Sequence, residues 1–256
     1  MPLVREIETA LSVLAPKELA AEWDNVGLLV GRPGREVQKV LVALDVTEQT
    51  AEEAAQWGAE LIVSHHPVIF HPAKRVTDQD PDGRLLLRLL ESGLAAVCMH
   101  TNLDAAIGGV NDALAAALGL VDAAPLHENG IARIGTLPQP LALPEFLQRV
   151  KTTLSPNGMR YVDGGRHIQK VAVGGGACGD FLWEAAGAGC DAFVTADLKY
   201  NHFLDAQAMG LTLVDAGHFP TEDVACPVLV RYLQEKFPGL QVKKSASHRE
   251  AIQYFV

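Results

Sequence analysis

The chain has 256 residues, of which 48% are apolar, and carries a formal charge of −10 from 21 Lys and Arg against 31 Asp and Glu. This is enough apolar material for one large domain or two ordinary ones, whereas the acidic balance gives no general field that would hold a polyanion, so nucleic acid is not expected as a partner. Because no apolar stretch approaches the roughly 20 residues of a membrane span and the N-terminus lacks the order of a secretory signal, we expect a cytoplasmic protein without membrane contact.

Short apolar runs alternate with longer amphipathic segments along the chain, which is typical of a sheet covered by helices on both faces. In chain order, we predict a buried strand over 39–45, a helix over 48–57, a second strand over 60–64 and a third over 93–97. This alternation predicts an α/β fold.

The second half of the chain repeats this series. A strand over 170–175, a helix over 181–188 and a strand over 191–195 follow at a constant offset of 131 residues (from 39 to 170) without a gap, and a strand over 210–214 completes the series. Any two strand–helix–strand units share apolar strands and an Ala-Gly helix ending, so the likeness could reflect the fold alone. The sharper hypothesis is an internal duplication, with two similar α/β lobes around a pseudo-twofold axis, which requires the same strand order in both lobes.

We divide the chain into two lobes and a C-terminal segment. The first lobe covers 1–125, the second covers 126–214, and the C-terminal segment covers 215–256. The loose polar stretch 122–130 marks the boundary between the lobes. Strands predicted at 240–244 and 250–255 would fit the sheet of either lobe, and we assign the segment to the first lobe.

The four cysteines do not form a metal-binding or disulfide pattern. None has CxxC spacing, and each lies in an apolar or glycine-rich context where a reduced side chain would pack. They are Cys98, Cys178, Cys190 and Cys226. A disulfide framework and a thiolate zinc site are therefore not expected.

Side chains that bind metals or move protons follow four of the predicted strands. They are His65 and His66, His100 and Asp104, Asp197, and His218 with Glu222. Ligands of open α/β sheets bind outside the carboxyl ends of the strands, and all four clusters lie at such ends. Pro67 favours the end of the strand before it, which would let the adjacent histidines reach one site. Pro220 suits the first turn of a helix, so His218 and Glu222 would face the same way, about one turn apart.

Each cluster also has an explanation without a ligand. One histidine of the pair 65–66 would lie in the core and the other at the surface, Asp104 would cap a helix that begins near Gly109, and Glu222 would complement a helix N-terminus. His100 fits a core position bonded to backbone as well as it fits a residue that orients a metal ligand or shuttles protons.

Considered together, three imidazoles and two carboxylates indicate a site for two divalent ions per subunit. These ligands are His65, His66, Asp104, His218 and Glu222. They exceed what one tetrahedral structural ion needs and are too few to saturate two octahedral ions, so open positions remain for water or substrate. Carboxylates bridge two ions where a neutral imidazole cannot, which makes Asp104 and Glu222 the expected bridges. The donors suit Zn, Fe, Mn, Co or Ni, and the excess positive charge would attract an anionic small molecule.

Four motifs in this order resemble a known family. They are Ala21-Glu22-Trp23-Asp24-Asn25-Val26-Gly27-Leu28, Ser64-His65-His66-Pro67, His100-Thr101-Asn102-Leu103-Asp104 with Gly108-Gly109-Val110-Asn111-Asp112, and Asp215-Ala216-Gly217-His218-Phe219-Pro220-Thr221-Glu222. The chain is similar to the YbgI-type, Nif-three-like dinuclear metal proteins, often named GTP cyclohydrolase 1 type 2 homologs. It resembles their short members, which lack an inserted central domain.

The resemblance implies two linked α/β lobes with a dinuclear metal site between them, and a toroidal homohexamer, a trimer of dimers, whose metal sites face the internal cavity. It implies as metal ligands the same five residues that the chemistry selects. One stretch departs from the family, since many relatives carry a Gly-Glu-Met-rich segment and paired histidines after the strand 191–195, whereas this chain has Ala196-Asp197-Leu198-Lys199-Tyr200-Asn201-His202. Asp197 would replace the acidic residue there, but a role for His202 as an acid or base does not follow.

The leading functional hypothesis is a metal-dependent hydrolase of a nucleotide-like or other phosphate-bearing small molecule, with His100 and Asp197 as catalytic candidates that move protons. The activity in the family name comes from the resemblance only, because no residues clearly read a guanine. The rival hypothesis is a metal-handling or regulatory scaffold without turnover, since open coordination positions serve metal exchange as well as catalysis. A purely structural metal is weaker, because a closed structural zinc needs fewer ligands.

Overall fold

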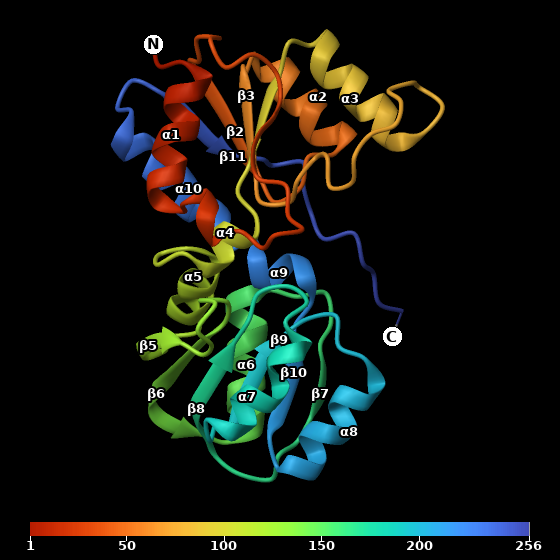
Figure 1. The fold of residues 1–256 in the computed structure, drawn as a ribbon. Coiled ribbons are helices and arrows are strands. Elements are labelled where there is room, and N and C mark those ends of the chain that lie inside the picture. Colours follow the sequence, from red (N-terminus) through yellow and green to blue (C-terminus); the bar gives the residue numbers. More distant parts are fainter. Residues whose placement is uncertain (256) are drawn as a thin grey trace. The chain divides into compact units, whose positions relative to one another are not determined.

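The computed structural model describes residues 1–255, and the chain forms two compact units. Unit 1 comprises Met1–Ala106 and Cys226–Arg249, and unit 2 comprises Ile107–Ala225 and the stretch that starts at Glu250. Each unit has its own sheet with its own helices (Figure 1). Among the described residues, no helix is long and apolar enough to cross a membrane, and α6 and α10, the longest, have 12 residues each.

Unit 1 contains a five-stranded sheet in the order β1-β4-β3-β2-β11. The strands are β1 (Gly27–Val30), β2 (Lys39–Ala43), β3 (Leu61–Ser64), β4 (Ala95–Cys98) and β11 (Gln241–Lys244). All run parallel except β1, which pairs antiparallel with β4 at one edge. The helices are α1 (Val4–Leu14), the 3₁₀ turn η1 (Lys17–Leu19), α2 (Glu48–Trp57), α3 (Pro81–Glu91), α4 (Thr101–Ala105) and α10 (Ala225–Lys236).

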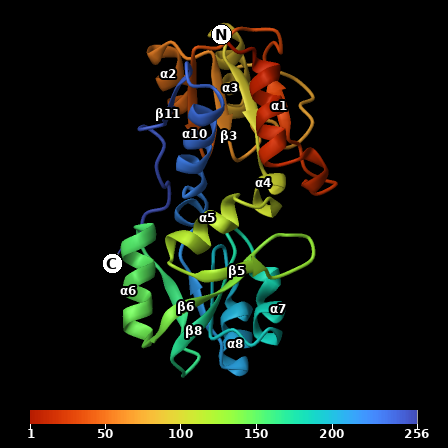
Figure 2. The ribbon, with the colours of Figure 1, turned by 90° about the vertical axis from the view of Figure 1, so that its left-hand side faces the viewer.

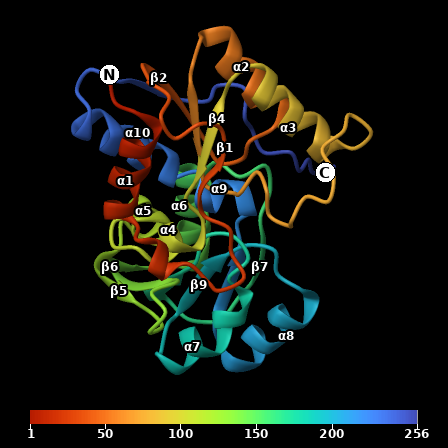
Figure 3. The same ribbon diagram turned by 45° about the horizontal axis from the view of Figure 1, so that its top comes forward.

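Helices cover both faces of this sheet, as its nearly unbroken apolar strands require. α2 and α3 lie on one face and α1 and α10 on the other (Figures 1 and 3). On the first face, Leu41 and Ile62 of the sheet pack in one cluster with Ala51 and Ala54 of α2 and Leu89 of α3. A sheet buried in this way opens toward solvent mainly at the strand ends, where polar side chains can be placed.

Unit 2 contains a six-stranded sheet in the order β5-β6-β8-β9-β10-β7. The strands are β5 (Val121–Pro125), β6 (Arg133–Leu141), β7 (Arg160–Val162), β8 (Ile168–Val173), β9 (Ala192–Thr195) and β10 (Thr212–Asp215). β8, β9 and β10 are parallel, and β5, β6 and β7 join them through antiparallel pairs. The helices are α5 (Val110–Ala117), α6 (Leu143–Leu154), the 3₁₀ turn η2 (Gly179–Phe181), α7 (Leu182–Gly187), α8 (Tyr200–Met209) and α9 (His218–Glu222).

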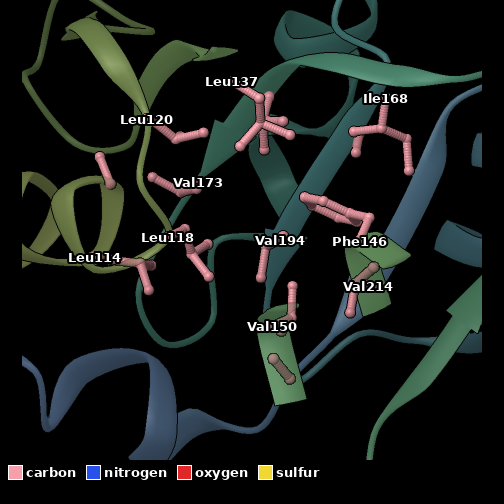
Figure 4. Packing of buried hydrophobic residues seen from close by; sticks show 14 of the residues in the cluster. Leu114, Leu118, Leu120, Leu137, Phe146, Val150, Ile168, Val173, Val194 and Val214 are labelled. Carbon is pink, nitrogen blue, oxygen red and sulfur yellow. The ribbon is translucent and has the colours of Figure 1, made fainter. Parts of the chain in front are cut away.

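The core of unit 2 also fills both faces of its sheet. Figure 2 shows α6 on one side of β6 and β8, and α7 and α8 on the other. Phe146 and Val150 of α6 pack against Val173, Val194 and Val214 of three adjacent strands (Figure 4). Phe146 and the three strand valines are fully buried, so this layer fixes the strand ends that carry Asp197 and α9.

The two sheets share their strand order and their register, which confirms the predicted pair of similar α/β lobes. The order β1-β4-β3-β2 of unit 1 matches β7-β10-β9-β8 of unit 2, with the antiparallel strand at the same edge. The paired residues are Val40↔Leu61, Leu41↔Ile62 and Val42↔Val63 in unit 1, and Val171↔Ala192, Ala172↔Phe193 and Val173↔Val194 in unit 2. Every pair is related by the offset of 131 residues seen in the sequence.

Side-chain bonds repeat at the same offset. Glu60 accepts hydrogen bonds from the backbone N–H of Lys39 at 2.9 Å, and Asp191 accepts the equivalent bond from Lys170 at 2.8 Å. The Lys39 ammonium donates to the carbonyl oxygen of Trp57, and the Lys170 ammonium donates to that of Ala188, the equivalent position in the second repeat. Polar details of this kind do not follow from a shared fold class, so they support duplication over coincidence.

Two helices pack in a different unit from the strand and short helix that precede them in the chain. α5 follows β4 and α4 in the chain but packs in unit 2, where Leu114 and Leu118 enter the core. α10 follows β10 and α9 but packs in unit 1, where the Tyr232 hydroxyl donates to the Ala10 carbonyl oxygen at 2.6 Å. The units therefore change at 106/107 and 225/226, whereas the sequence-based division placed these points at 125/126 and 214/215. Local patterns do not show which sheet a helix will cover.

Two segments near these boundaries differ from their predicted structure. The stretch 122–130, expected to be loose, contributes β5, which pairs with β6. Residues 250–255, expected to form a strand, have no regular structure. There, the carbonyl oxygen of Ile252 accepts a hydrogen bond from the Asn157 side chain at 2.7 Å, where a strand would need a backbone partner. The strand predicted at 240–244 is present as β11 in unit 1.

Candidate metal centre

Three histidines of unit 1 gather where β3 and β4 end. Ring nitrogens of His65, His66 and His100 lie within 4.8 Å of one another. β3 and β4 are parallel neighbours, so their carboxyl ends coincide, and one strand delivers two of these rings while the other delivers the third. The structure thus brings His100, which we predicted as a catalytic candidate, into the same cluster as the predicted ligands His65 and His66.

The adjacent histidines share one site because the backbone stops behaving as a strand. In a regular strand their side chains would point to opposite faces. Here the backbone N–H groups of His65 and His66 both donate to the carbonyl oxygen of Leu44, at 3.1 and 2.9 Å, and the ring centroids lie 4.9 Å apart. The two rings therefore lie together at the strand end, although His65 is buried and His66 is partly exposed.

Each ring of this cluster is held through its Nδ1 atom. Nδ1 of His65 lies 2.8 Å from the carbonyl oxygen of Met99. A carbonyl oxygen can only accept, so Nδ1 carries the proton and the lone pair of the neutral ring is on Nε2. Nδ1 of His66 and Nδ1 of His100 are held in the same way by carboxylates, at 2.7 and 2.8 Å. Metal-binding histidines are typically oriented by such a bond from the ring nitrogen that does not bind the metal.

The two carboxylates behind the rings are Asp45, which holds His66, and Asp24, which holds His100. Burial raises the pKa of both groups, but hydrogen bonds to His100 and Thr101 on Asp24, and to His248 and His66 on Asp45, lower each pKa well below its usual range. Both side chains are therefore acceptors at neutral pH. His248, from the segment after β11, lies 2.8 Å from the second oxygen of Asp45.

Asp104 adds a carboxylate to the histidine cluster of unit 1. It lies within α4 and is buried, with 8% of the residue exposed, and Oδ1 lies 3.6 Å from Nε2 of His65. This separation is too long for a hydrogen bond, whereas two ligands of one tetrahedral ion with bonds of about 2.1 Å lie about 3.4 Å apart. Gly109, and not Asp104, is the N-cap of the next helix, so the capping explanation is wrong.

Unit 2 places His218 and Glu222 on α9, directly after β10. Nε2 of His218 lies 3.0 Å from Oε2 of Glu222, as the predicted one-turn spacing requires, and Nδ1 lies 2.7 Å from Oδ2 of Asp197. Burial lowers the pKa of His218, but the hydrogen bonds to Asp197 and Glu222 outweigh it and raise the pKa to about 10. Glu222 is buried and is the last residue of α9, so it does not complement a helix N-terminus.

Asp197 holds His218 from the end of β9. Its backbone is left-handed, with φ 53°, a conformation that Asp tolerates better than most residues. A hydrogen bond from His218, opposed by burial, lowers the pKa of Asp197. Its role as a proton-moving group stays a prediction, while the geometry makes it the partner that orients the His218 ring.

A glycine loop after β8 allows α9 to approach the sheet. The backbone N–H of Gly175 donates to Asn111 Oδ1 at 2.8 Å, and that of Gly176 donates to Thr221 Oγ1 at 3.0 Å. A Cβ atom on Gly176, whose φ is +64°, would lie 2.1 Å from Oε1 of Glu222. These glycines therefore serve close packing against the helix that carries Glu222.

Three residues of the candidate site escaped the sequence analysis as functional partners: Asp24, Asp45 and His248. Asp45 follows the buried strand β2 and could have been found by the rule that selected His65. No sequence signal indicates His248, which is about 200 residues from its partner. His202 does not join the site, because its Nδ1 accepts from the backbone N–H of Lys199 at 3.3 Å at the start of α8.

Imidazole and carboxylate groups in these positions fit a metal ion. Four rings have Nδ1 held by an oxygen acceptor, which leaves Nε2 as the atom suited to bind a metal. Carboxylates lie beside two of those rings, Asp104 by His65 and Glu222 by His218. The set contains no thiolate, so it suits the borderline divalent ions named above.

The chain is similar to known proteins in sequence and in fold. The family model Duf34/NIF3 (NGG1p interacting factor 3) matches residues 2–251. A protein of Streptomyces coelicolor named "GTP cyclohydrolase 1 type 2 homolog" is 38% identical, with 92% of this chain and 87% of the relative aligned. One of the same name from Clostridium perfringens is 34% identical over 89% of this chain and 88% of its own length. The crystal structure of a Bacillus cereus protein related to NIF3 superposes with a TM-score of 0.93 at 26% identity, covering 100% of this chain and 99% of the other. By its sequence and its two-lobed fold, the chain belongs to the Duf34/NIF3 family.

Proposed function

We propose that the protein is a dinuclear metal-dependent hydrolase that acts on a nucleotide-like or other phosphate-bearing small molecule. The observation that carries this proposal is the common orientation of four histidine rings, each held at Nδ1 by an oxygen acceptor. Such orientation favours metal binding, because the rotation of each histidine ring is already restricted before the ion binds. The family name supports the substrate class by resemblance.

His65, His66 and Asp104 of unit 1 and His218 and Glu222 of unit 2 would hold two divalent ions. When bound, such ions polarise a phosphoryl oxygen and lower the pKa of water to near neutrality. Asp45 and Asp197 would keep His66 and His218 in the tautomer that binds through Nε2.

His100 would exchange protons with the substrate or with water. Its Nδ1 is held by Asp24 and its side chain retains 15% exposure, so Nε2 is the atom that can take up or release a proton. The aspartate stabilises the charged ring that results. We propose no residue that reads guanine.

The experiment loads the purified protein with each candidate metal and measures metal stoichiometry, metal dissociation rate and turnover on a panel of nucleotides and phosphoesters. His65→Ala and Glu222→Ala should lose bound metal and turnover together, whereas His167→Ala, at an exposed histidine, should behave like the wild type. Equal turnover in all variants would remove this site from the mechanism. Fast metal exchange without turnover on any substrate would favour a metal-handling or regulatory scaffold.

Three further expectations accompany this proposal, of which only the assembly rests on the family resemblance. The protein would be cytoplasmic, would bind an anionic small molecule, and would assemble as a homohexamer of three dimers. Light scattering on the purified protein measures the assembly directly, and a monomer or dimer would contradict it.

A further inference from the structure

Two large aromatic side chains of unit 1 are exposed beside the histidine cluster. Trp23 is 64% exposed and Phe70 is 44% exposed. Their rings meet edge to face, with centroids 5.9 Å apart and planes at 65°. Single exposed apolar residues are common, but a pair that forms a corner of two ring faces is a specific surface.

The His100 ring lies between these two aromatic rings and the proposed metal ligands His65 and His66. The centroid of His100 is 6.1 Å from Trp23 and 6.2 Å from Phe70, and it is 5.2 Å from His65 and 5.5 Å from His66. A molecule stacked on the aromatic corner would therefore have its substituents within reach of the histidine cluster.

The backbone on both sides of this corner is fixed by hydrogen bonds. Asp24, whose side chain is fully buried, accepts from His100 and from the backbone N–H of Thr101 at 3.0 Å. Asn25 donates from its side chain to the carbonyl oxygen of Ile69 at 2.6 Å, which ties the Trp23 segment to the Phe70 segment. The carboxylate that orients His100 thus also positions the residue next to it, Trp23.

A cavity of about 470 Å³ adjoins Phe70, within the size range of small-molecule sites. It is lined by the segment that runs from Pro67 to Arg75 and by residues at the start of α3. Lys74 and Arg75 bring two cations to its wall, and Arg75 lies 3.6 Å from Asp80. Asp80 and Asp82 line the same cavity and balance the two cations, so the cavity offers room for a small molecule next to an aromatic surface.

From these observations we infer that Trp23 and Phe70 form a stacking site for a planar nitrogen heterocycle, such as a purine, whose anionic substituent reaches the histidine cluster. The position of the anionic substituent rests on the proposed function, whereas the position of the heterocycle rests on the two aromatic rings alone. Trp23 and Phe70 would set substrate class without touching the metal. Base stacking on an aromatic side chain tolerates any base, so the site should bind purines with little preference among them.

The test compares the affinities of GMP, AMP and ribose 5-phosphate for the metal-loaded protein by calorimetry. The last probe has the same sugar and phosphate but no ring. Wild type should bind both nucleotides on the order of tenfold more tightly than ribose 5-phosphate. Trp23→Ala should remove this difference, leaving ribose 5-phosphate affinity and metal content unchanged, and Trp23→Phe should retain most of it. Trp183→Ala, at a 63% exposed tryptophan of unit 2, is the matched control.

The outcomes separate this inference from the proposed function. Equal affinity of wild type for all three probes, or a Trp23→Ala protein that still prefers nucleotides, would overturn the stacking site while the metal centre stands. If Trp23→Ala alters only the mass of the assembly, the two aromatic rings form a subunit contact, and this result would also overturn the stacking site. If the protein binds no metal but prefers GMP through Trp23, the stacking site stands and the proposed function fails.

Discussion

The two repeats share a scaffold but differ at the strand ends that carry chemistry. β3 is followed by His65 and His66, whereas the same place after β9 carries Ala196 and Asp197. The next strand in each repeat leads into a five-residue helix, α4 with Asp104 in one and α9 with His218 and Glu222 in the other. Both repeats keep the same strand register, because a one-residue shift would expose the apolar face of a buried strand. Loop residues at a strand end are free of that constraint.

The difference also shows how each repeat orients its histidines. In unit 1, Asp45 at the end of β2 holds His66, and the equivalent position of unit 2 is Gly176. Gly176 leaves room for Glu222, and Asp197 takes over the orienting role for His218. One repeat therefore supplies rings with carboxylates behind them, and the other supplies a ring and a carboxylate from one helix.

The largest expected effect comes from a histidine that only the first repeat has. His65→Ala should weaken metal binding on the order of 100-fold or more, because a ligand is lost as well as its orientation. Removal of metal with a chelator should lower the melting temperature of the wild type and leave that of His65→Ala unchanged. Competition with a fluorescent chelator measures the affinity, and His167→Ala serves as the control.

The orienting carboxylates should have the next largest effect. Asp45→Asn and Asp197→Asn keep the shape of the side chain, and Asn tolerates the left-handed backbone at position 197. Each should weaken metal binding by roughly 10- to 100-fold. If only one of the two variants changes the affinity in a direct titration, the repeats do not contribute equally to the site.

Gly176→Ala should separate metal affinity from stability. A Cβ atom there would displace Glu222, so metal affinity should fall by about tenfold. The backbone cost of a left-handed alanine, about 1 kcal/mol, should equal that of Gly189→Ala, where φ is +72° and no atom lies within 4 Å of the new Cβ. Urea unfolding and metal titration of both variants check this, and equal metal affinities would contradict it.

The smallest effect concerns a carboxylate outside the site. Burial raises the pKa of Glu53, but hydrogen bonds from Ser245, Ser247 and the backbone N–H of Ala246 lower it to about 2. The stability from this group should be present above pH 4.5 and be lost as pH falls toward 2. Glu53→Gln should cost about 1 kcal/mol in the free energy of unfolding at pH 7 and less at pH 3.

Its counterpart in the second repeat provides the control. Glu184 is exposed and has the same position in the repeat, so Glu184→Gln should leave the unfolding free energy within about 0.5 kcal/mol of the wild type at both pH values. A Glu53→Gln protein whose deficit grows as the pH is lowered would contradict the assignment of the pKa shift.

Much of the fold followed from periodicity. The strands at 39–45, 60–64 and 191–195 were predicted because parallel strands buried on both faces are nearly continuous apolar runs. The chemistry at strand ends followed from the same rule, which brought His65, His66 and Asp104 together in unit 1. The strand at 250–255 was predicted wrongly, since alternation of apolar residues does not reveal whether a sheet edge is within reach.

By itself, the sequence determined the α/β class, the repeat at 131 residues and the residue types that could hold a metal ion, because each can be recognised from the order and spacing of residues along the chain. The tertiary structure decided which helix covers which sheet, so α5 and α10 were placed only there. It also decided which nitrogen of each ring is held. The hydrogen bonds between His100 and Asp24 and between His248 and Asp45 join residues far apart in the chain, and only the packing of the strands makes them neighbours.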